Sequence, residues 1–200
     1  RARLDAAHAA GVLGDDRARE TVQQCLRVMK QATEHYGGTV IKTMGDEVMS
    51  TFPSADDALN AANQMQQRIT NTIRIETDDS HVSIRIGCHF GPVVLQNKDI
   101  FGSSVHTANR MTSQAKAGQI VLTSDTVGRL TPEWRACTRQ IDVTSVRGQS
   151  EEIELYEVLW QQEDVTSMLP SIALDARVGH RPKRVRLSFQ GREYVLEDAN

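Results

Sequence analysis

The charged side chains at one predicted hairpin turn are the first candidates for chemistry in this chain. Residues 37–52, with the sequence GGTVIKTMGDEVMSTF, read as two strands that reverse direction at Gly45 and Asp46. Asp46 and Glu47 place two carboxylates at the tip, where a hard cation such as magnesium could bind through carboxylate and water oxygens. Turns also favour aspartate for backbone reasons, so the pattern by itself leaves both interpretations open.

Lys42 lies four residues before Asp46, on the incoming strand of the same hairpin. Strand alternation places it on one face with Met44 and away from Ile41 and Thr43. A lysine in this apolar setting either extends its ammonium group to solvent or contacts a ligand.

A second set of polar residues lies on a predicted helix within residues 101–118. His106 and Arg110 are four residues apart, which places them on one helix face, about 6 Å apart along the axis. The side chains around them are small, and a guanidinium suits the oxygens of a phosphate. The alternative is that His106 and Arg110 form a surface pair that hydrogen-bonds to polar groups at the end of a sheet.

Two further charges have weaker support from the sequence alone. Asp99 lies just ahead of the predicted helix and could start a turn. Arg147 lies at the tip of a predicted hairpin near residue 150, where an exposed charge is normal.

The elements that must position these residues follow from periodicity and turn signals. Ser54 followed by Asp57 is a capping box that opens the second helix. The predicted order, with long helices between antiparallel strand pairs, indicates an α+β fold (an α/β sandwich) with helices packed on a mixed sheet. The predicted elements are a helix over 15–36, the hairpin over 37–52, a helix over 54–73, strands within 81–95, a helix over 101–118, a strand over 119–124, a short helix over 124–130, and a hairpin over 139–160.

Composition limits the class of protein. The chain has 200 residues, is 39% hydrophobic and carries a net charge of −3, which fits a globular chain and gives no general case for binding nucleic acid. No apolar run approaches the roughly 20 residues of a membrane helix. The three cysteines are far apart in apolar contexts, which is typical of core residues in a reduced, cytoplasmic protein.

The chain changes character after Trp160. Residues 161–182 are polar and lack periodicity, so we predict a linker there. Residues 183–200 alternate and turn at Gln190 and Gly191, which predicts one β-hairpin. The basic residues that precede and open it favour a solvated face over a phosphate-binding patch.

Five stretches of the sequence, taken in order, belong together: GGTVIKTMGDEVMSTF, VSIRIGCHFGPVV, DIFGSSVHTANRM, AGQIVLTSDT and VRGQSEEIELYEV. Together they resemble the catalytic domain of class III nucleotide cyclases. The resemblance covers residues 1–160 and implies a ferredoxin-like βαββαβ sheet with helices on one face. It also implies head-to-tail homodimers that hold ATP between two sheets, with Mg²⁺ or Mn²⁺ as cofactor. Residues 183–200 resemble the first strands of a forkhead-associated domain, which implies a regulatory, phosphopeptide-binding partner.

The resemblance assigns a role to each candidate residue. Asp46, after Gly45 in the substrate-binding turn, matches one of two metal-binding aspartates. Lys42 and Asp99 match the pair that reads adenine, which implies ATP rather than GTP. Arg110 matches the arginine that stabilises the α-phosphate, and Arg147 lies where the family grips the terminal phosphates.

The sequence departs from the family in two places. The chain begins in what resembles the segment after the family's first strand, so the first metal aspartate is not seen. His106 stands where the family has asparagine. We therefore expect an adenylate cyclase that converts ATP to 3′,5′-cyclic AMP and pyrophosphate. The alternative is a cyclase-like module that dimerises or senses nucleotide without turnover. A diguanylate cyclase is disfavoured, because TMGDEVM lacks the second glycine of that family's signature.

Overall fold

The computed structural model describes residues 1–4, 15–73, 82–145, 152–161, 184–189 and 192–197. The chain divides into two compact units, Arg1–Val165 and Thr166–Asn200. Arg147, nearly all of the predicted linker, and the turn at Gln190 and Gly191 lie outside the described residues. In the second unit, β10 (Arg184–Phe189) pairs antiparallel with β11 (Arg192–Glu197), which is the hairpin expected from the sequence.

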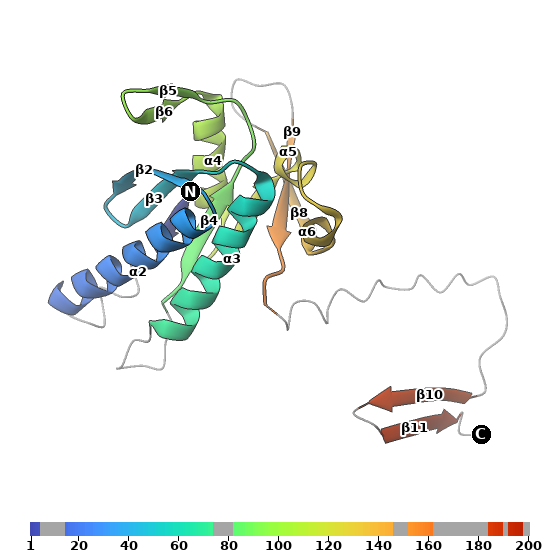
Figure 1. Cartoon of the computed structure of the whole chain (residues 1–200). Coiled ribbons are helices and arrows are strands. Elements are labelled where there is room, and N and C mark those ends of the chain that lie inside the picture. The colour runs from blue at the N-terminus through green and yellow to red at the C-terminus, as the bar shows by residue number, and fades with distance from the viewer. Residues whose placement is uncertain (5–14, 74–81, 146–151, 162–183, 190–191, 198–200) are drawn as a thin grey trace. The chain divides into compact units, whose positions relative to one another are not determined.

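A seven-stranded mixed sheet forms the centre of the first unit (Figure 1). The strand order is β2-β3-β1-β4-β7-β9-β8. The β4–β7 pair is parallel and the other pairs are antiparallel. The strands are β1 (Ala2–Leu4), β2 (Thr39–Met44), β3 (Glu47–Thr51), β4 (Ile84–Cys88), β7 (Ile120–Thr123), β8 (Thr138–Ser145) and β9 (Glu152–Val158).

Helices α2 and α3 cover one face of this sheet and run side by side (Figure 1). The capping predicted at Ser54 is confirmed, because its Oγ accepts a hydrogen bond of 3.1 Å from the main-chain N–H of Asp57. The helices are α2 (Asp15–His35), α3 (Ala55–Thr72), α4 (Ser103–Gln114), α5 (Ser124–Val127) and α6 (Pro132–Ala136).

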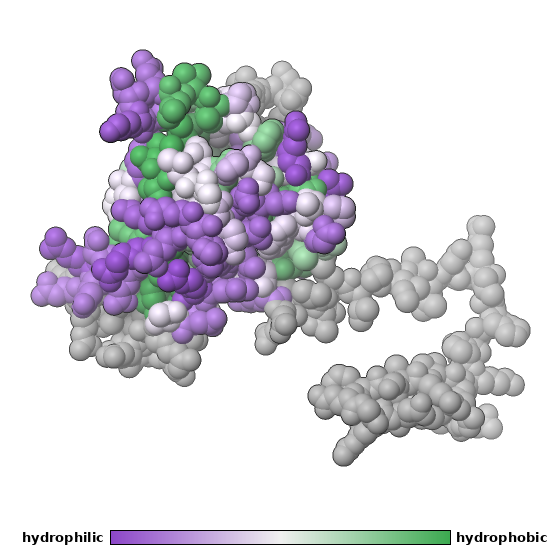
Figure 2. Space-filling view, viewed as in Figure 1, coloured by the Kyte–Doolittle hydropathy of each residue, from purple (hydrophilic) through white to green (hydrophobic). Residues whose placement is uncertain are grey.

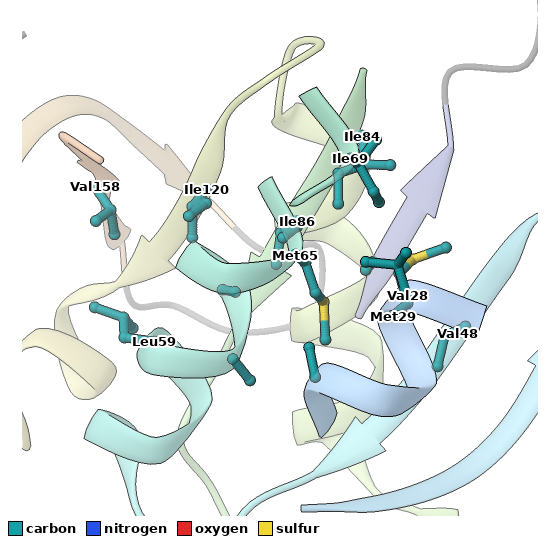
Figure 3. Packing of buried hydrophobic residues seen from close by; sticks show 14 of the residues in the cluster. Val28, Met29, Val48, Leu59, Met65, Ile69, Ile84, Ile86, Ile120 and Val158 are labelled. Atoms are coloured by element: carbon teal, nitrogen blue, oxygen red, sulfur yellow. The ribbon is translucent and has the colours of Figure 1, made fainter. Parts of the chain in front are cut away.

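The larger core lies between the sheet and this helical layer. Figure 3 shows Met29, Met65 and Ile69 from α2 and α3 packed beside Ile84 and Ile86 of β4. Burial of each such side chain contributes about 1.5–3 kcal/mol. This packing fixes the strands whose ends carry the candidate site.

Helix α4 packs on the opposite face of the sheet. Met111 of α4 belongs to a second, smaller core cluster with Val121 and Leu155. Gly87 of β4 lies directly against Thr112, whereas Ile86 points to the larger core. The mixed α+β sheet is confirmed, but the expectation of helices on one face holds for α2 and α3 and not for α4. The glycine supplies the physical reason, because only a residue without a side chain lets α4 approach this closely.

Two strands, β1 and β6, were not predicted. β1 inserts between β3 and β4, with Ala2 opposite both Val48 and Ile86. A strand therefore occupies the position that the sequence analysis treated as missing. β5 (Val94–Gln96) corresponds to the second of the strands expected within 81–95, and it pairs with β6 (Asp99–Phe101) in a separate two-stranded sheet. β1 and β6 have three residues each, which is too short to show a period of two, and the sequence pattern therefore missed them.

Helix lengths and hydropathy also bear on membrane insertion. Among the residues that the structure describes, no helix combines the length and apolar character needed to cross a bilayer.

Candidate functional site

The turn between β2 and β3 is built as the sequence predicted. Gly45 has a φ of 57°, a left-handed conformation that glycine adopts without steric cost. The turn places Asp46 at the edge of the sheet, and its main-chain carbonyl accepts a hydrogen bond from the N–H of Leu4.

Two arginines from the start of the chain face the carboxylates of this turn. The Nε of Arg3 lies 3.7 Å from the Asp46 carboxylate and 3.3 Å from that of Glu47. The guanidinium of Arg1 forms a second ion pair with Glu47, whose side chain is only 11% exposed. A buried carboxylate needs such partners, because an unpaired charge away from water is costly. The sequence analysis did not anticipate these contacts, since β1 was not predicted.

The side chains at this turn can be compared with the ligands that a metal site needs. Class III cyclases generally use divalent metals. No group of three or more histidine, cysteine, aspartate or glutamate side chains suited to a metal occurs within the described part of the chain. Asp46 and Glu47 are the carboxylates at the turn, and both already face guanidinium groups. The described residues therefore do not fit a metal pair, and no chemical step below passes through one.

Lys42 and Asp99 are brought together by the fold. The Lys42 Nζ donates to Asp99 Oδ2 at 2.7 Å, although the residues come from β2 and β6. The other carboxylate oxygen, Asp99 Oδ1, accepts from the main-chain N–H of Ile100 at 2.8 Å. These two bonds, with Lys42 first, lower the pKa of Asp99 below its ordinary value. The pair therefore presents a fixed ammonium group beside a fixed carboxylate.

A β-bulge helps to aim Lys42. The register between β2 and β3 shifts between Val40 and Lys42, so that Lys42 lies opposite Met49. Bulges bend a strand and redirect its side chains. Simple alternation along the strand could not have predicted this orientation.

Helix α4 carries His106 and Arg110, as the sequence predicted. The His106 side chain is exposed and that of Arg110 is half-buried. Asn109, which the sequence analysis did not select, accepts a hydrogen bond from the Arg1 guanidinium through Oδ1. Arg1 thus links α4 to Glu47 at the acidic turn. The sequence feature that could have pointed to Asn109 is its position immediately before Arg110.

A pocket of about 210 Å³ opens between the ends of β3 and β4 and the first half of α4. Its lining includes Phe52, Cys88, His89 and Ser104, none of which the sequence analysis proposed. The Nδ1 of His89 lies 2.8 Å from the hydroxyl of Thr123. Burial lowers the pKa of His89, and the nearby Asp125 opposes this effect more weakly.

Comparison with known proteins identifies the family. The model of the adenylate and guanylate cyclase catalytic domain matches residues 15–159. The chain therefore belongs to the adenylate and guanylate cyclase catalytic domain family, as the motifs predicted.

Named relatives share part of this sequence. An adenylate cyclase from Anabaena cylindrica is 30% identical over 152 residues, which cover 66% of this chain and 30% of the relative. A putative adenylate cyclase 3 from Rhizobium meliloti (strain 1021) is 31% identical over 85 residues, which cover 42% of this chain and 14% of the relative. The matched region thus spans less than a third of either relative's length.

Solved structures share the fold. The catalytic core of a rhodopsin-guanylyl cyclase with converted specificity, in complex with ATPαS, has a TM-score of 0.67 and 24% identity. The match covers 78% of this chain and 91% of that one. The guanylate cyclase domain of RhGC from Catenaria anguillulae, in complex with GTP, has a TM-score of 0.65 and 23% identity, and the match covers 78% and 92% of the two chains. Because one neighbour holds an adenine nucleotide and the other a guanine nucleotide, the fold does not decide the base.

Proposed function

We propose that this domain is an adenylate cyclase that converts ATP to 3′,5′-cyclic AMP and pyrophosphate. The observation that carries the proposal is the Lys42–Asp99 pair, with 2.7 Å between Nζ and Oδ2. The cyclase family supplies the reaction class, and this pair supplies the preference for adenine.

The hydrogen-bonding pattern of the pair matches the adenine edge. Adenine presents a ring nitrogen that accepts a hydrogen bond and an adjacent amine that donates one. Guanine reverses this pattern, because its ring N–H donates a hydrogen bond and its adjacent carbonyl oxygen accepts one. The Lys42 ammonium has three donors, and the Asp99 carboxylate has about four acceptor positions. Both groups can therefore bind the base while they remain paired with each other.

The proposed reaction joins the ribose 3′ oxygen to the α-phosphorus. The bond from that phosphorus to the bridging oxygen breaks, pyrophosphate leaves, and the hydroxyl proton is lost to water. Arg110 stabilises the charge that develops on the α-phosphate. His106 donates a hydrogen bond to a phosphate or ribose oxygen, and Arg147 holds the terminal phosphates.

We include magnesium or manganese in the proposal because the family generally uses divalent metal ions. Asp46 would be one ligand. The described residues do not supply the others, so the metal is assigned no step.

A homodimer that shares its active sites is also proposed, because Arg110 and Asp46 are expected to act on one triphosphate from different chains. Apolar side chains on the β5–β6 hairpin support it. Val94, Leu95 and Phe101 are 63%, 71% and 50% exposed, which favours burial against a partner.

For the second unit, we propose that the β10–β11 hairpin forms the start of a forkhead-associated domain. Such a domain would give the protein a regulatory, phosphopeptide-binding role.

The test is product formation from ATP and GTP, each with magnesium or manganese chloride. We expect cyclic AMP to exceed cyclic GMP in the natural protein. The double variant Lys42→Glu, Asp99→Asn reverses the donor and acceptor positions and should lower the ATP-to-GTP ratio by about tenfold or more. Lys98→Met removes a charge next to Asp99 and should leave the ratio unchanged. An unaltered ratio in the double variant would count against the assignment of the pair.

The alternative is a cyclase-like module that binds nucleotide without turnover. The arginines at Asp46 and Glu47, together with His106, favour this function. If calorimetry shows that ATP binds, but no cyclic AMP forms with either magnesium or manganese, the binding module is favoured over the enzyme.

A further inference from the structure

A small hydrogen-bond network joins the end of β4 to the end of β7 and to α5. The main-chain N–H of Phe90 donates to the hydroxyl of Thr126 at 2.9 Å. The hydroxyls of Thr126 and Thr123 lie 3.1 Å apart, and that of Thr123 lies 2.8 Å from Nδ1 of His89. Thr126 and Thr123 are 2% and 0% exposed, so water does not replace these bonds and the polar groups must satisfy one another.

The order of donors and acceptors in this network selects one form of the imidazole. Each threonine hydroxyl has a single proton to donate. Thr126 accepts from the Phe90 N–H and can donate to Thr123, and the Thr123 hydroxyl can then donate to the ring. A proton on Nδ1 of His89 would reverse both hydroxyls and leave Thr126 to donate to the carbonyl of Cys88, which is 3.5 Å away. The bonding pattern therefore favours a neutral imidazole with its proton on Nε2.

The imidazole also lies against the segment that follows β4. Residues 89–93 connect β4 to the β5–β6 hairpin, whose hydrophobic surface Figure 2 shows at the top of the view. A Cβ placed on Gly91 would lie 2.9 Å from Nε2 of His89 and would overlap the Oγ of Ser104, the second residue of α4. The same Oγ donates to the carbonyl of Pro92 at 2.7 Å. Gly91 therefore fills a narrow space that the ring and the first turn of α4 share.

Helix α4 depends on this segment because of the way it begins. Its N-cap residue is Gly102, and no side chain in the described part of the chain caps it. The contacts of Ser104 with residues 89–93 hold the first turn instead. Toward the other end of the helix, Thr112 packs directly on β4. Arg110 lies between these two attachments, so a displacement of the first turn changes the direction of its side chain.

We propose that His89 is a positioning residue for the start of α4. Its ring, which the two threonines hold neutral with the proton on Nε2, keeps the first turn in place and so aims Arg110 at the substrate. The role of Arg110 rests on the proposed function, whereas the form of the ring and its hold on the helix do not. Burial agrees with a neutral ring, because it lowers the pKa of His89, and the nearby Asp125 opposes this effect more weakly.

The form of the ring can be measured by nitrogen NMR of the His89 side chain near neutral pH. In the natural protein we expect an unprotonated Nδ1 and a protonated Nε2. Thr123→Val removes the hydroxyl, and the two signals should move toward the averaged values of a ring that exchanges between its neutral forms. Thr123→Ser keeps the hydroxyl and should keep the signals apart. A proton on Nδ1 in the natural protein, or unchanged signals in Thr123→Val, would overturn the role of the threonines.

The hold on the helix is tested by hydrogen exchange of residues 105–110. His89→Ala removes a half-buried ring and should speed exchange there by about three- to tenfold. Thr123→Val should act in the same direction. Thr33→Val is the matched control, because Thr33 is also 0% exposed and its hydroxyl bonds within α2, to the carbonyl of Met29. Natural exchange in His89→Ala, or equal acceleration in Thr33→Val, would overturn the positioning role.

The consequence for catalysis is measured as kcat and KM for ATP. Arg110 is proposed to act on charge that develops in the transition state, so His89→Ala should lower kcat by about tenfold and change KM by less than about twofold. Thr33→Val should keep the natural kcat. A change confined to KM, or a natural kcat in His89→Ala, would overturn the link to Arg110. If the natural protein forms no cyclic AMP, the proposed function fails instead, while the exchange of α4 still decides whether His89 positions the helix.

Discussion

Gly87 of β4 lies so close to α4 that a methyl group on its Cα would overlap the main-chain nitrogen of Thr112. This contact sets the distance between the sheet and the helix that carries His106 and Arg110. We predict that Gly87→Ala lowers the free energy of unfolding by about 1–3 kcal/mol or more, because neither backbone can move away freely. Urea denaturation measures the change.

Gly128→Ala is the matched control for that variant. A Cβ at Gly128 would make ordinary contacts, 3.5 Å from the Ser124 carbonyl oxygen. Its stability should stay close to that of the natural protein, and an equal loss in both variants would show that the approach of α4 is not the cause.

The Lys42–Asp99 pair has a consequence for titration. Lys42→Met removes the main cause of the lowered Asp99 pKa, so that pKa should rise toward 3.8. NMR titration of the carboxyl group measures it. The pair stabilises the fold above the unfolded pKa of aspartate and loses this effect as pH falls through the lower folded pKa. Lys98→Met, which removes an exposed charge beside Asp99, is the control; an equal rise there would contradict a specific pair.

His89 should make stability depend on pH. Burial lowers its pKa below 6.5, so the unfolded chain binds the proton more readily than the folded one. Stability is therefore complete above about pH 6.5 and declines as pH falls below this value. His89→Gln should flatten that part of the curve, which thermal unfolding between pH 5 and 8 measures. A curve that keeps its slope in the variant would exclude His89 as the cause.

The exposed apolar side chains of the β5–β6 hairpin should control self-association, as the proposed homodimer requires. Leu95 is 71% exposed, so Leu95→Glu should leave the fold intact and shift sedimentation toward the monomer. Val143→Glu places the same charge at a residue of β8 that is 45% exposed and serves as the control. A dimer that withstands the Leu95 change, or that is lost equally with Val143→Glu, would move the interface away from β5–β6.

His106 should affect the rate of catalysis. Imidazole offers a single ring N–H donor and one ring acceptor, whereas the amide of asparagine offers two N–H donors and a carbonyl oxygen. We predict lower cyclic AMP formation in the natural protein than in His106→Asn. Equal rates in the two proteins would remove any role for the imidazole.

The sequence alone determined the features that depend on local chemistry. The periodicity of α2 and α3, the cap at Ser54 and the turn at Gly45 follow from neighbouring residues, and the structure has them where they were predicted. The ordered motifs also pointed to the cyclase family, because the order of short signatures survives when overall identity is low.

Only the tertiary structure decided the features that depend on distant residues. Three features require the chain to close on itself: the direct 2.7 Å bond between Lys42 and Asp99, which the resemblance had named only as a pair, the insertion of β1 beside β3 and β4, and the packing of α4 on the second face. The physical reason is that long-range packing aligns these groups, whereas local propensity acts over only a few residues. The sequence could therefore propose the residues of the site, and the sheet determined which of them meet.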